Sequence, residues 1–281
     1  IFKINFLKNK TILIYLMGGL GNNLSQLFLA FKLESIGYKV EVNDFLCHKN
    51  LVTKFLRWSL HDQSVESVYK NSFKKNKNNL LKIFIDLIFL MVSKHLKGFF
   101  GNYLFDSNNL ESLSDLSKKN KIILGGYWQK IDIYNENNLI DFKIYLFGDS
   151  FSKISKGPNL HIRGGDFIKF KKNINKSYYL SALSSINNSN NIKVFTNDIN
   201  FSNKILPNTH NYEYSKNNYA KDDFTDMIMS NLLICSNSTF SIWAGLLSNA
   251  EKIFIPFVDN KSLKINIDLD SFKNKRIEVI K

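Results

Sequence analysis

The second half of the chain alternates between short apolar runs and longer segments with helical periodicity, and this alternation constrains the fold most strongly. The sequence predicts strands over 159–162, 192–196, 232–235 and 252–257, separated by helices over 177–186, 220–231 and 240–247. Strands joined in order by helices form parallel sheets that are covered by helices. The pattern therefore predicts an α/β domain with a parallel sheet covered by helices.

The N-terminal half begins with the same kind of unit. An apolar run over 12–17 predicts a strand, a glycine-rich turn follows, and the next helix ends at Gly37. Further strands are predicted over 38–42 and 121–124. Because Gly, Ser and Pro gather between positions 144 and 158, we place the domain boundary at 150, giving domains 1–150 and 151–281.

The charge of the chain raises the question of an anionic partner. Its 281 residues carry a formal charge of +14, but the lysines are dispersed and no zinc-finger or RNP-type pattern is present, so we expect no nucleic-acid partner. Two distant cysteines and no recognisable signal sequence lead us to expect a cytoplasmic protein. The histidines are scattered, with neither CxxC nor HExxH, so the sequence predicts no metal site.

One apolar segment, 80–92, bears on membrane contact. It is too short to span a bilayer and is interrupted by Lys82 and Asp86, and basic residues flank both of its ends. Two interpretations stay open. The segment is either a helix packed in the first domain with solvated ends, or a helix that contacts an anionic membrane surface.

Four polar clusters follow predicted strands, at the edge where parallel sheets bind ligands. They are MGGLGNN (17–23), HIRGGDF (161–167), FTND (195–198) and SNSTFSIW (236–243). In the second cluster Arg163 stands beside two glycines and Asp166, which suits a phosphate because guanidinium is a planar, permanently charged fork. The hydroxyls of the fourth cluster precede an apolar helix and suit a diphosphate. A structural Arg–Asp pair and a simple helix cap remain as alternatives.

The sequence also contains weaker signals for other classes of protein. Gly19 and Gly21, with Asp44 after the next strand, imitate a dinucleotide fingerprint, but Leu24 stands where a third glycine is needed. A dinucleotide-dependent oxidoreductase is therefore an alternative, as is a basic module that binds nucleic acid or membrane. The sequence Asp268-Leu269-Asp270 has the form of a metal-binding DxD motif, yet it lacks a strand-loop context.

Taken jointly, the motifs resemble the α-1,2-fucosyltransferase family. The chain carries GGLGN, GGYWQ, HxRxGDF, a TxD strand end, and DxxxM followed by NSTFSIW, in the family's order over positions 12–258. The resemblance implies an inverting, metal-independent enzyme of GT-B type, with two Rossmann-like domains and no cofactor. It would transfer L-fucose from GDP-β-L-fucose to the 2-hydroxyl of a terminal galactose-like residue. The implied acceptor is a galactose-terminated oligosaccharide or a lipid-linked precursor of a surface glycan.

The resemblance also implies roles for individual residues, beginning with the reaction itself. Arg163 becomes the diphosphate contact that stabilises the leaving group, and Asp166 becomes the nearest candidate base. Asn22, together with Gly19 and Gly21, becomes part of a loop that faces the fucose and the acceptor. The expected catalytic residues are therefore Asn22, Arg163 and Asp166, with no metal.

The remaining implied contacts concern the donor. His161 neighbours the guanosine, and Asp223 accepts hydrogen bonds from the guanine edge. The other implied contacts are Asn197 and Asp198 after a strand, and the phosphate-binding hydroxyls of Ser238 and Thr239. One departure stands out, because the family's second arginine is Gly164 in this chain.

Overall fold

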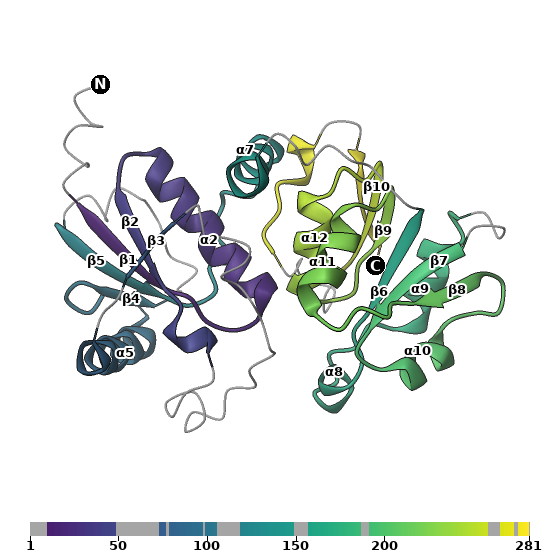
Figure 1. Cartoon of the computed structure of the whole chain (residues 1–281), viewed down its shortest axis with the longest axis horizontal. Coiled ribbons are helices and arrows are strands. Elements are labelled where there is room, and N and C mark those ends of the chain that lie inside the picture. Colours follow the sequence, from purple (N-terminus) through teal and green to yellow (C-terminus); the bar gives the residue numbers. More distant parts are fainter. Residues whose placement is uncertain are drawn as a thin grey trace. The chain divides into compact units, whose positions relative to one another are not determined.

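The computed structural model of the protein describes residues 10–48, 73–76, 79–97, 99–105, 119–148, 157–186, 191–257, 265–272 and 275–280. The chain divides into two compact units, Ile1–Ile131 (unit 1) and Asp132–Lys281 (unit 2) (Figure 1). Each unit contains its own parallel sheet.

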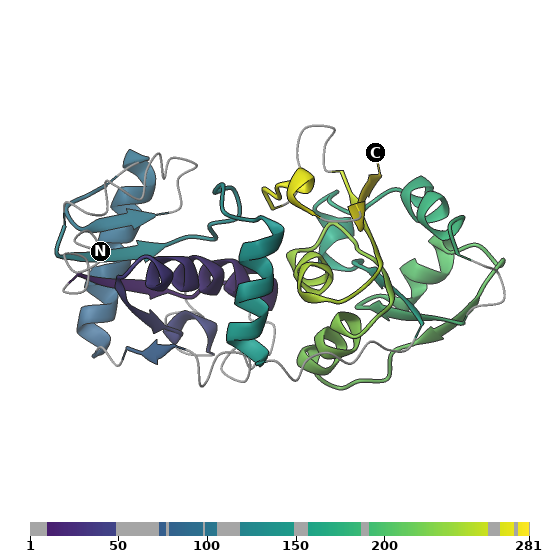
Figure 2. The ribbon, with the colours of Figure 1, turned by 90° about the horizontal axis from the view of Figure 1, so that it is seen from above.

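Unit 1 is built on a five-stranded sheet in the order β3-β2-β1-β5-β4, in which every pairing is parallel. Its strands are β1 (Thr11–Tyr15), β2 (Lys39–Asn43), β3 (Lys74–Lys75), β4 (Tyr103–Phe105) and β5 (Lys121–Gly125). Its described helices are α2 (Leu20–Ser35), the 3-10 helix η1 (Phe45–Cys47) and α5 (Leu80–Leu96). Helices α2 and α5 lie on opposite faces of the sheet (Figures 1 and 2).

Because α2 and α5 cover both faces of the first sheet, its central strand is mainly apolar. Strand β1 reads as a continuous apolar run because its side chains are buried on both sides. Leu13 and Tyr15 pack in a cluster with Ile83 and Leu90 of α5. The predicted end of α2 is confirmed, since Gly37 follows the helix with φ +103°, which a residue without a side chain adopts at little cost.

Unit 2 is built on a six-stranded parallel sheet in the order β11-β10-β9-β6-β7-β8. Its strands are β6 (Pro158–Ile162), β7 (Asn191–Thr196), β8 (Asn211–Tyr214), β9 (Leu232–Ile234), β10 (Lys252–Pro256) and β11 (Ile277–Ile280). Its helices are α7 (Glu136–Phe147), α8 (Asp166–Lys169), α9 (Lys176–Leu183), α10 (Ile199–Ile205), α11 (Ala220–Ile228), α12 (Thr239–Leu247) and the 3-10 helix η2 (Leu269–Ser271).

The prediction of two α/β units with parallel sheets is confirmed. The order in unit 2 is that of a Rossmann sheet, because the chain proceeds outward from β6 through β7 and β8 and then returns to the other side through β9. The strand order therefore reverses between β6 and β9. In unit 1 it reverses between β1 and β5. A crevice for a ligand forms at the carboxyl ends of such strand pairs.

The units divide at Ile131 and Asp132, whereas composition suggested a boundary at 150. Packing explains the difference, since α7 precedes position 150 but belongs to unit 2. The ring of Trp243 on α12 lies edge-on to Tyr134 and Phe142, with centroids 5.9 and 5.8 Å away. Composition marks where a chain is irregular and cannot report which core an adjacent helix joins.

Candidate active site

Three of the four predicted polar clusters meet at one edge of the second sheet. Strand β6 lies between β9 and β7, so the loops that follow these three strands are neighbours. The Nδ1 atom of His161 and the hydroxyl of Ser236 are 2.7 Å apart, which joins the end of β6 to the residues after β9. The clusters therefore meet at the point where the strand order reverses.

His161 is a buried, neutral member of this edge. Burial, with a smaller contribution from the charge of Arg163, lowers the pKa of its imidazole to about 3. Its ring also lies 5.6 Å from the ring of Phe240. A histidine that stays neutral at physiological pH cannot attract a phosphate through charge, so its direct contribution is shape and hydrogen bonding.

Arg163 directly follows β6 and is held from two sides. Its Nη2 atom lies 3.0 Å from Oδ1 and 3.1 Å from Oδ2 of Asp166, and its guanidinium lies 5.3 Å from the ring centre of Phe167. The side chain of Arg163 is 20% exposed, and that of Asp166 is 41% exposed. Asp166 is thus placed to orient the guanidinium, and its carboxylate remains accessible from solvent.

The loop that carries Arg163 is fixed through its backbone. The amide of Gly164 donates to Oδ1 of Asn197 (2.9 Å), and the amide of Gly165 donates to Oδ2 of Asp198 (3.2 Å). The other oxygen of Asp198 caps α10 by accepting from the amide of Phe201 at 2.9 Å. These backbone bonds, that from Phe201 foremost, lower the pKa of Asp198.

Asn197 and Asp198 therefore have a positioning role that their motif did not reveal. A Cβ atom on Gly164 would lie 2.6 Å from the Cβ of Asp198, which is closer than real contacts allow. Gly164, which stands where the resembled family has its second arginine, therefore lets Asp198 approach the backbone more closely than a residue with a side chain would allow. The predicted direct contacts of Asn197 and Asp198 with the donor stay predictions.

The fourth cluster opens α12. Ser238 is the N-cap residue of the helix, although its hydroxyl lies 3.4 Å from the amide of Phe240. Ser236 and Ser241 are buried and bonded to each other, the amide of Ser236 donating to the hydroxyl of Ser241 at 3.2 Å. Thr239, the first helical residue, is only partly buried. Ser238 and Thr239 thus place their hydroxyls at the N-terminus of α12. Ser236 and Ser241 instead bond to each other and stabilise the turn before the helix.

Asn237 belongs to the fourth cluster, although the sequence predicted no individual role for it. It is 6% exposed, and its side-chain amide donates to the carbonyl of Lys172 at 3.4 Å. Its Oδ1 atom is buried and has no hydrogen-bond partner among the described residues. Its place within the SNSTFSIW cluster was the only signal that could have identified it.

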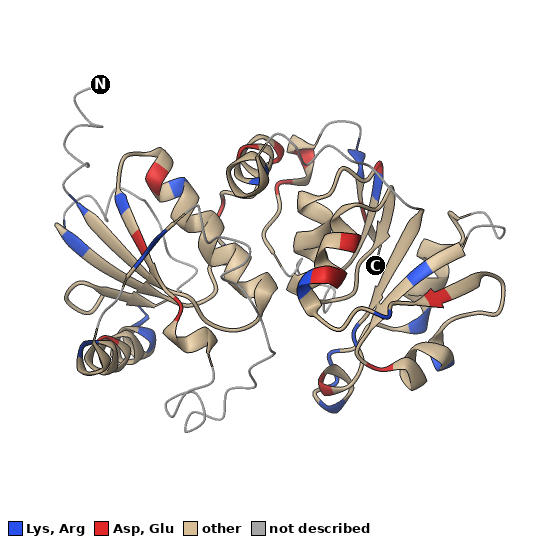
Figure 3. Ribbon diagram, in the orientation of Figure 1, with Lys and Arg blue, Asp and Glu red and all other residues tan. Residues whose placement is uncertain are grey.

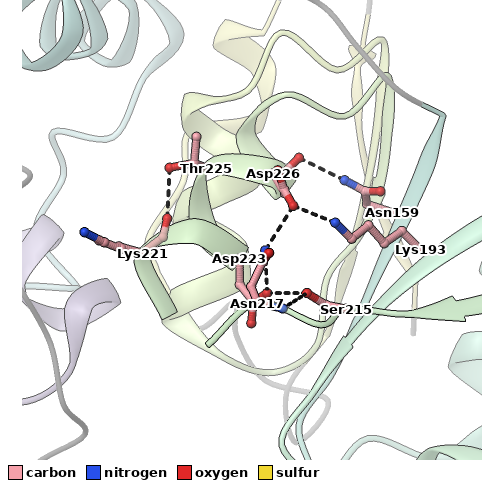
Figure 4. Close-up of polar contacts among 8 residues, drawn as sticks. All are labelled: Asn159, Lys193, Ser215, Asn217, Lys221, Asp223, Thr225 and Asp226. Atoms are coloured by element: carbon pink, nitrogen blue, oxygen red, sulfur yellow. Dashed lines mark hydrogen bonds and ion pairs between the residues drawn. The ribbon is translucent and has the colours of Figure 1, made fainter. Parts of the chain in front are cut away.

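Asp223 lies in the first turn of α11 and faces the residues that follow β8 (Figure 4). Its Oδ1 accepts from the hydroxyl of Ser215 (2.6 Å) and from the side-chain Nδ2 of Asn217 (3.1 Å). Asn217 also donates to Asp226, which pairs with Lys193 at 2.6 Å. Burial raises the pKa of Asp223, and the two hydrogen bonds oppose this shift. Ser215 and Asn217 were not predicted, because neither belongs to a recognisable motif.

The N-terminal loop belongs to unit 1 and is organised around two glutamines. Gln26 donates to the carbonyls of Met17 (3.1 Å) and Gly126 (2.8 Å), which joins the loops after β1 and β5. Gln129 donates to Oδ1 of Asn22 at 2.8 Å. Asn22 is thus positioned by the GGYWQ segment, at the carboxyl edge where the first strand order reverses.

The two glycines predicted beside Asn22 occupy the start of α2. Gly19 is the N-cap residue, in an extended conformation, and Gly21 is buried in the first turn. Both therefore shape the loop through their backbone. Of the three residues predicted to be catalytic, Asn22 belongs to unit 1, whereas Arg163 and Asp166 belong to unit 2.

Metal ligands do not gather anywhere in the part of the chain that the structure describes, where no three His, Cys, Asp or Glu side chains form a possible metal site. Asp268 and Asp270 lie at η2, where the amide of Asp268 donates to the carbonyl of Tyr134 at 2.9 Å. The DxD sequence is thus on a turn before β11, away from the carboxyl end of a strand.

The fold and the site define a two-unit α/β protein with a cationic loop and a helix N-terminus at a Rossmann switch point. The family model described as Glycosyl transferase family 11 matches residues 146–275, which is most of unit 2. The matched residues include both Arg163 and Asp223.

Solved structures with a similar arrangement include two glycosyltransferases. NodZ alpha-1,6-fucosyltransferase soaked with GDP-fucose is 12% identical, with a TM-score of 0.41 over 88% of this chain and 94% of that chain. Heptosyltransferase WaaC of E. coli with ADP-2-deoxy-2-fluoro heptose is 10% identical, with a TM-score of 0.43 over 96% and 92%. The comparison with curated proteins finds no match.

Proposed function

We propose that the protein is an inverting α-1,2-fucosyltransferase of GT-B type that uses GDP-β-L-fucose and needs no metal or other cofactor. The observation that carries this proposal is the meeting of the Arg163 loop with the N-terminus of α12 at the edge of the sheet. A guanidinium and a helix N-terminus both attract the diphosphate of a sugar nucleotide. The family 11 match over the same residues supports this choice of substrate class.

The proposed reaction is a single displacement at the anomeric carbon of fucose. The 2-hydroxyl oxygen of the acceptor attacks that carbon, the bond to the β-phosphate oxygen breaks, and GDP leaves with the electron pair. Arg163 stabilises the negative charge that develops on the departing diphosphate. The hydroxyl proton passes to a base, for which we assign Asp166 because its carboxylate is near Arg163 and accessible. Asn22 is assigned to orient the fucose or the acceptor.

The acceptor that we propose is a galactose-terminated oligosaccharide or a lipid-linked glycan precursor. The oxidoreductase alternative is not favoured. In that alternative Asp44 would bind a ribose, but its side chain is 6% exposed and pairs with Lys75 at 2.8 Å. Leu24, at the position of the third glycine, is fully buried in the core.

The decisive experiment offers GDP-fucose together with a panel of galactosides and detects products by mass spectrometry. We expect the mass of one deoxyhexose to be added, and linkage analysis to find substitution at the 2-hydroxyl of galactose. Transfer from another sugar nucleotide in preference to GDP-fucose would contradict the donor, and substitution at another hydroxyl would contradict the linkage.

A first prediction concerns donor binding without metal. GDP in the presence of EDTA is expected to raise the Tm, because a ligand that binds only the native state stabilises it, by about 2.7 kcal/mol at one hundred times its Kd. Differential scanning fluorimetry measures the shift, with guanosine as the control for the diphosphate. A shift that requires Mn²⁺ would contradict metal-independent binding and direct attention to Asp268 and Asp270.

A second prediction concerns base selectivity. The guanine N1–H and amino group can both donate to a carboxylate, whereas adenine does not offer this pair, so GDP should inhibit far more strongly than ADP. Asp223→Ala is expected to remove most of this difference by weakening GDP alone. Asp222→Ala is the matched control, because Asp222 lies in the same first turn of α11. Equal inhibition of the unmodified protein by GDP and ADP would overturn the assignment of Asp223.

A further inference from the structure

Helix α5 presents an apolar surface on the side that faces away from its sheet. Its inner side carries the buried residues Ile83, Leu90 and Ser93. The opposite side carries seven large apolar side chains that are 37–69% exposed: Leu80, Leu81, Phe84, Ile85, Ile88, Met91 and Leu96. Phe100, just beyond the helix, is 38% exposed. Contiguous apolar surface of this extent on one helix marks an interaction site.

The single acidic residue of α5 does not disturb this surface. Asp86 is fully buried and accepts hydrogen bonds from the hydroxyls of Tyr15 (2.8 Å) and Tyr103 (2.9 Å). Lys82 forms an ion pair with the same carboxylate. The charge that interrupts the apolar run in the sequence is thus directed into unit 1, and the exposed side of α5 carries no carboxylate.

Positive charge gathers where the helix ends. Lys94 and Lys97 are exposed in the last turn and at the C-cap, and the Nζ of Lys94 lies 5.2 Å from the centre of the Phe105 ring. Lys119 joins them, because its Nζ donates to the carbonyl of Gly101 and lies 5.2 Å from the centre of the Phe99 ring. In Figure 3 the Asp86 position is the single acidic one on the ribbon of α5, and its other charged positions are lysines.

We propose that α5 docks the protein onto an anionic phospholipid surface. The apolar side enters the boundary between headgroups and acyl chains, and the lysines at the C-terminal end face the lipid phosphates. An exposed apolar side bordered by lysines, without an exposed carboxylate on the helix, matches the chemistry of such a surface. The helix would lie in the plane of the membrane, and no helix among the described residues is long and apolar enough to cross one.

Co-sedimentation with vesicles tests the proposal, because it does not depend on any enzymatic activity. We expect the full chain to bind vesicles of phosphatidylcholine with 30% phosphatidylglycerol, and to bind phosphatidylcholine alone weakly. Affinity for the anionic vesicles should fall as salt is raised from low to physiological concentration. Absence of binding at both salt concentrations would overturn the proposal.

Two pairs of substitutions separate the apolar and the cationic contributions. Phe84→Ser with Ile88→Ser is expected to lower vesicle affinity at least tenfold, and the control is Ile140→Ser with Ile144→Ser on α7, where both side chains are 47% exposed. Lys94→Gln with Lys97→Gln should lower affinity about fivefold per lysine. Its control, Lys176→Gln with Lys204→Gln, removes the same charge from unit 2 and should have little effect.

A fluorescent probe at one position tests the proposal even if the Phe84→Ser, Ile88→Ser variant does not fold. Cys47 and Cys235 are both buried, so Ile88→Cys can be labelled selectively with an environment-sensitive fluorophore. We expect its emission to shift to shorter wavelength when anionic vesicles are added. An unchanged emission would overturn the proposal. The proposal would also be overturned if the unmodified protein bound no vesicles but self-associated, and if the Phe84→Ser, Ile88→Ser variant did not self-associate, because α5 would then be an interface between copies of the chain.

Discussion

Replacing Arg163 with alanine is expected to lower kcat by about 10²- to 10³-fold, the usual loss when one preorganised donor to developing charge is removed. Arg163 is held by the two oxygens of Asp166 and by the ring of Phe167, so its guanidinium is already in place before the donor binds. Turnover of GDP-fucose with a saturating galactoside measures the effect. The fold should persist, because the side chain reaches solvent and belongs to neither apolar core.

Two variants make this result specific. Arg163→Lys should restore little activity, since an ammonium group cannot reproduce the planar fork that binds two phosphate oxygens. Lys169→Ala, which removes a nearby cation from α8, should leave turnover close to that of the unmodified protein. Near-normal turnover of the alanine variant would show that the Arg163–Asp166 pair only braces the loop.

Gly164→Arg, which would introduce the second arginine of the resembled family, is expected to reduce activity at least tenfold and to lower the free energy of unfolding by about 1 to 3 kcal/mol. The new Cβ would lie 2.6 Å from the Cβ of Asp198. Asp198 cannot easily move, because it accepts from the amides of Gly165 and Phe201. Turnover of GDP-fucose measures the loss of activity, and thermal unfolding measures the loss of stability.

Gly164→Ala separates the steric effect of a side chain at this position from the effect of an added positive charge. Because the conflict begins at the Cβ atom, alanine should reproduce most of the loss of stability, although it adds no charge. If Gly164→Arg were as stable as the unmodified protein and bound GDP-fucose more tightly, the loop would be able to rearrange, and Asp198 would not fix it.

Local sequence patterns were sufficient for much of the fold. Strand β1 and the strands of unit 2 that are buried on both faces read as apolar runs, and Gly37 marked the end of α2 correctly. Strands β8 and β11 were not predicted, because they lie at the edges of the sheet and carry mixed polar and apolar residues. An edge strand is defined by its pairing with a neighbour, which a local pattern does not record.

The three polar clusters that follow β6, β7 and β9 were enough to indicate the candidate site in unit 2, because the carboxyl ends of parallel strands in one sheet share an edge and the motifs there are short and local. The amino-acid sequence thus determined the α/β class, the location of Arg163 and Asp166, and the resemblance on which the proposed donor rests. Each of these depends on residues that are close together along the chain.

Only the tertiary structure decided what the long-range partners do. Asn197 and Asp198 bind the backbone of a loop more than thirty positions away in the sequence, and Asp86 accepts hydrogen bonds from hydroxyls on two different strands. The assignment of α7 to unit 2 likewise depends on Trp243. Such contacts join segments that are distant along the chain, and their geometry exists only once both sheets have formed and brought those segments together.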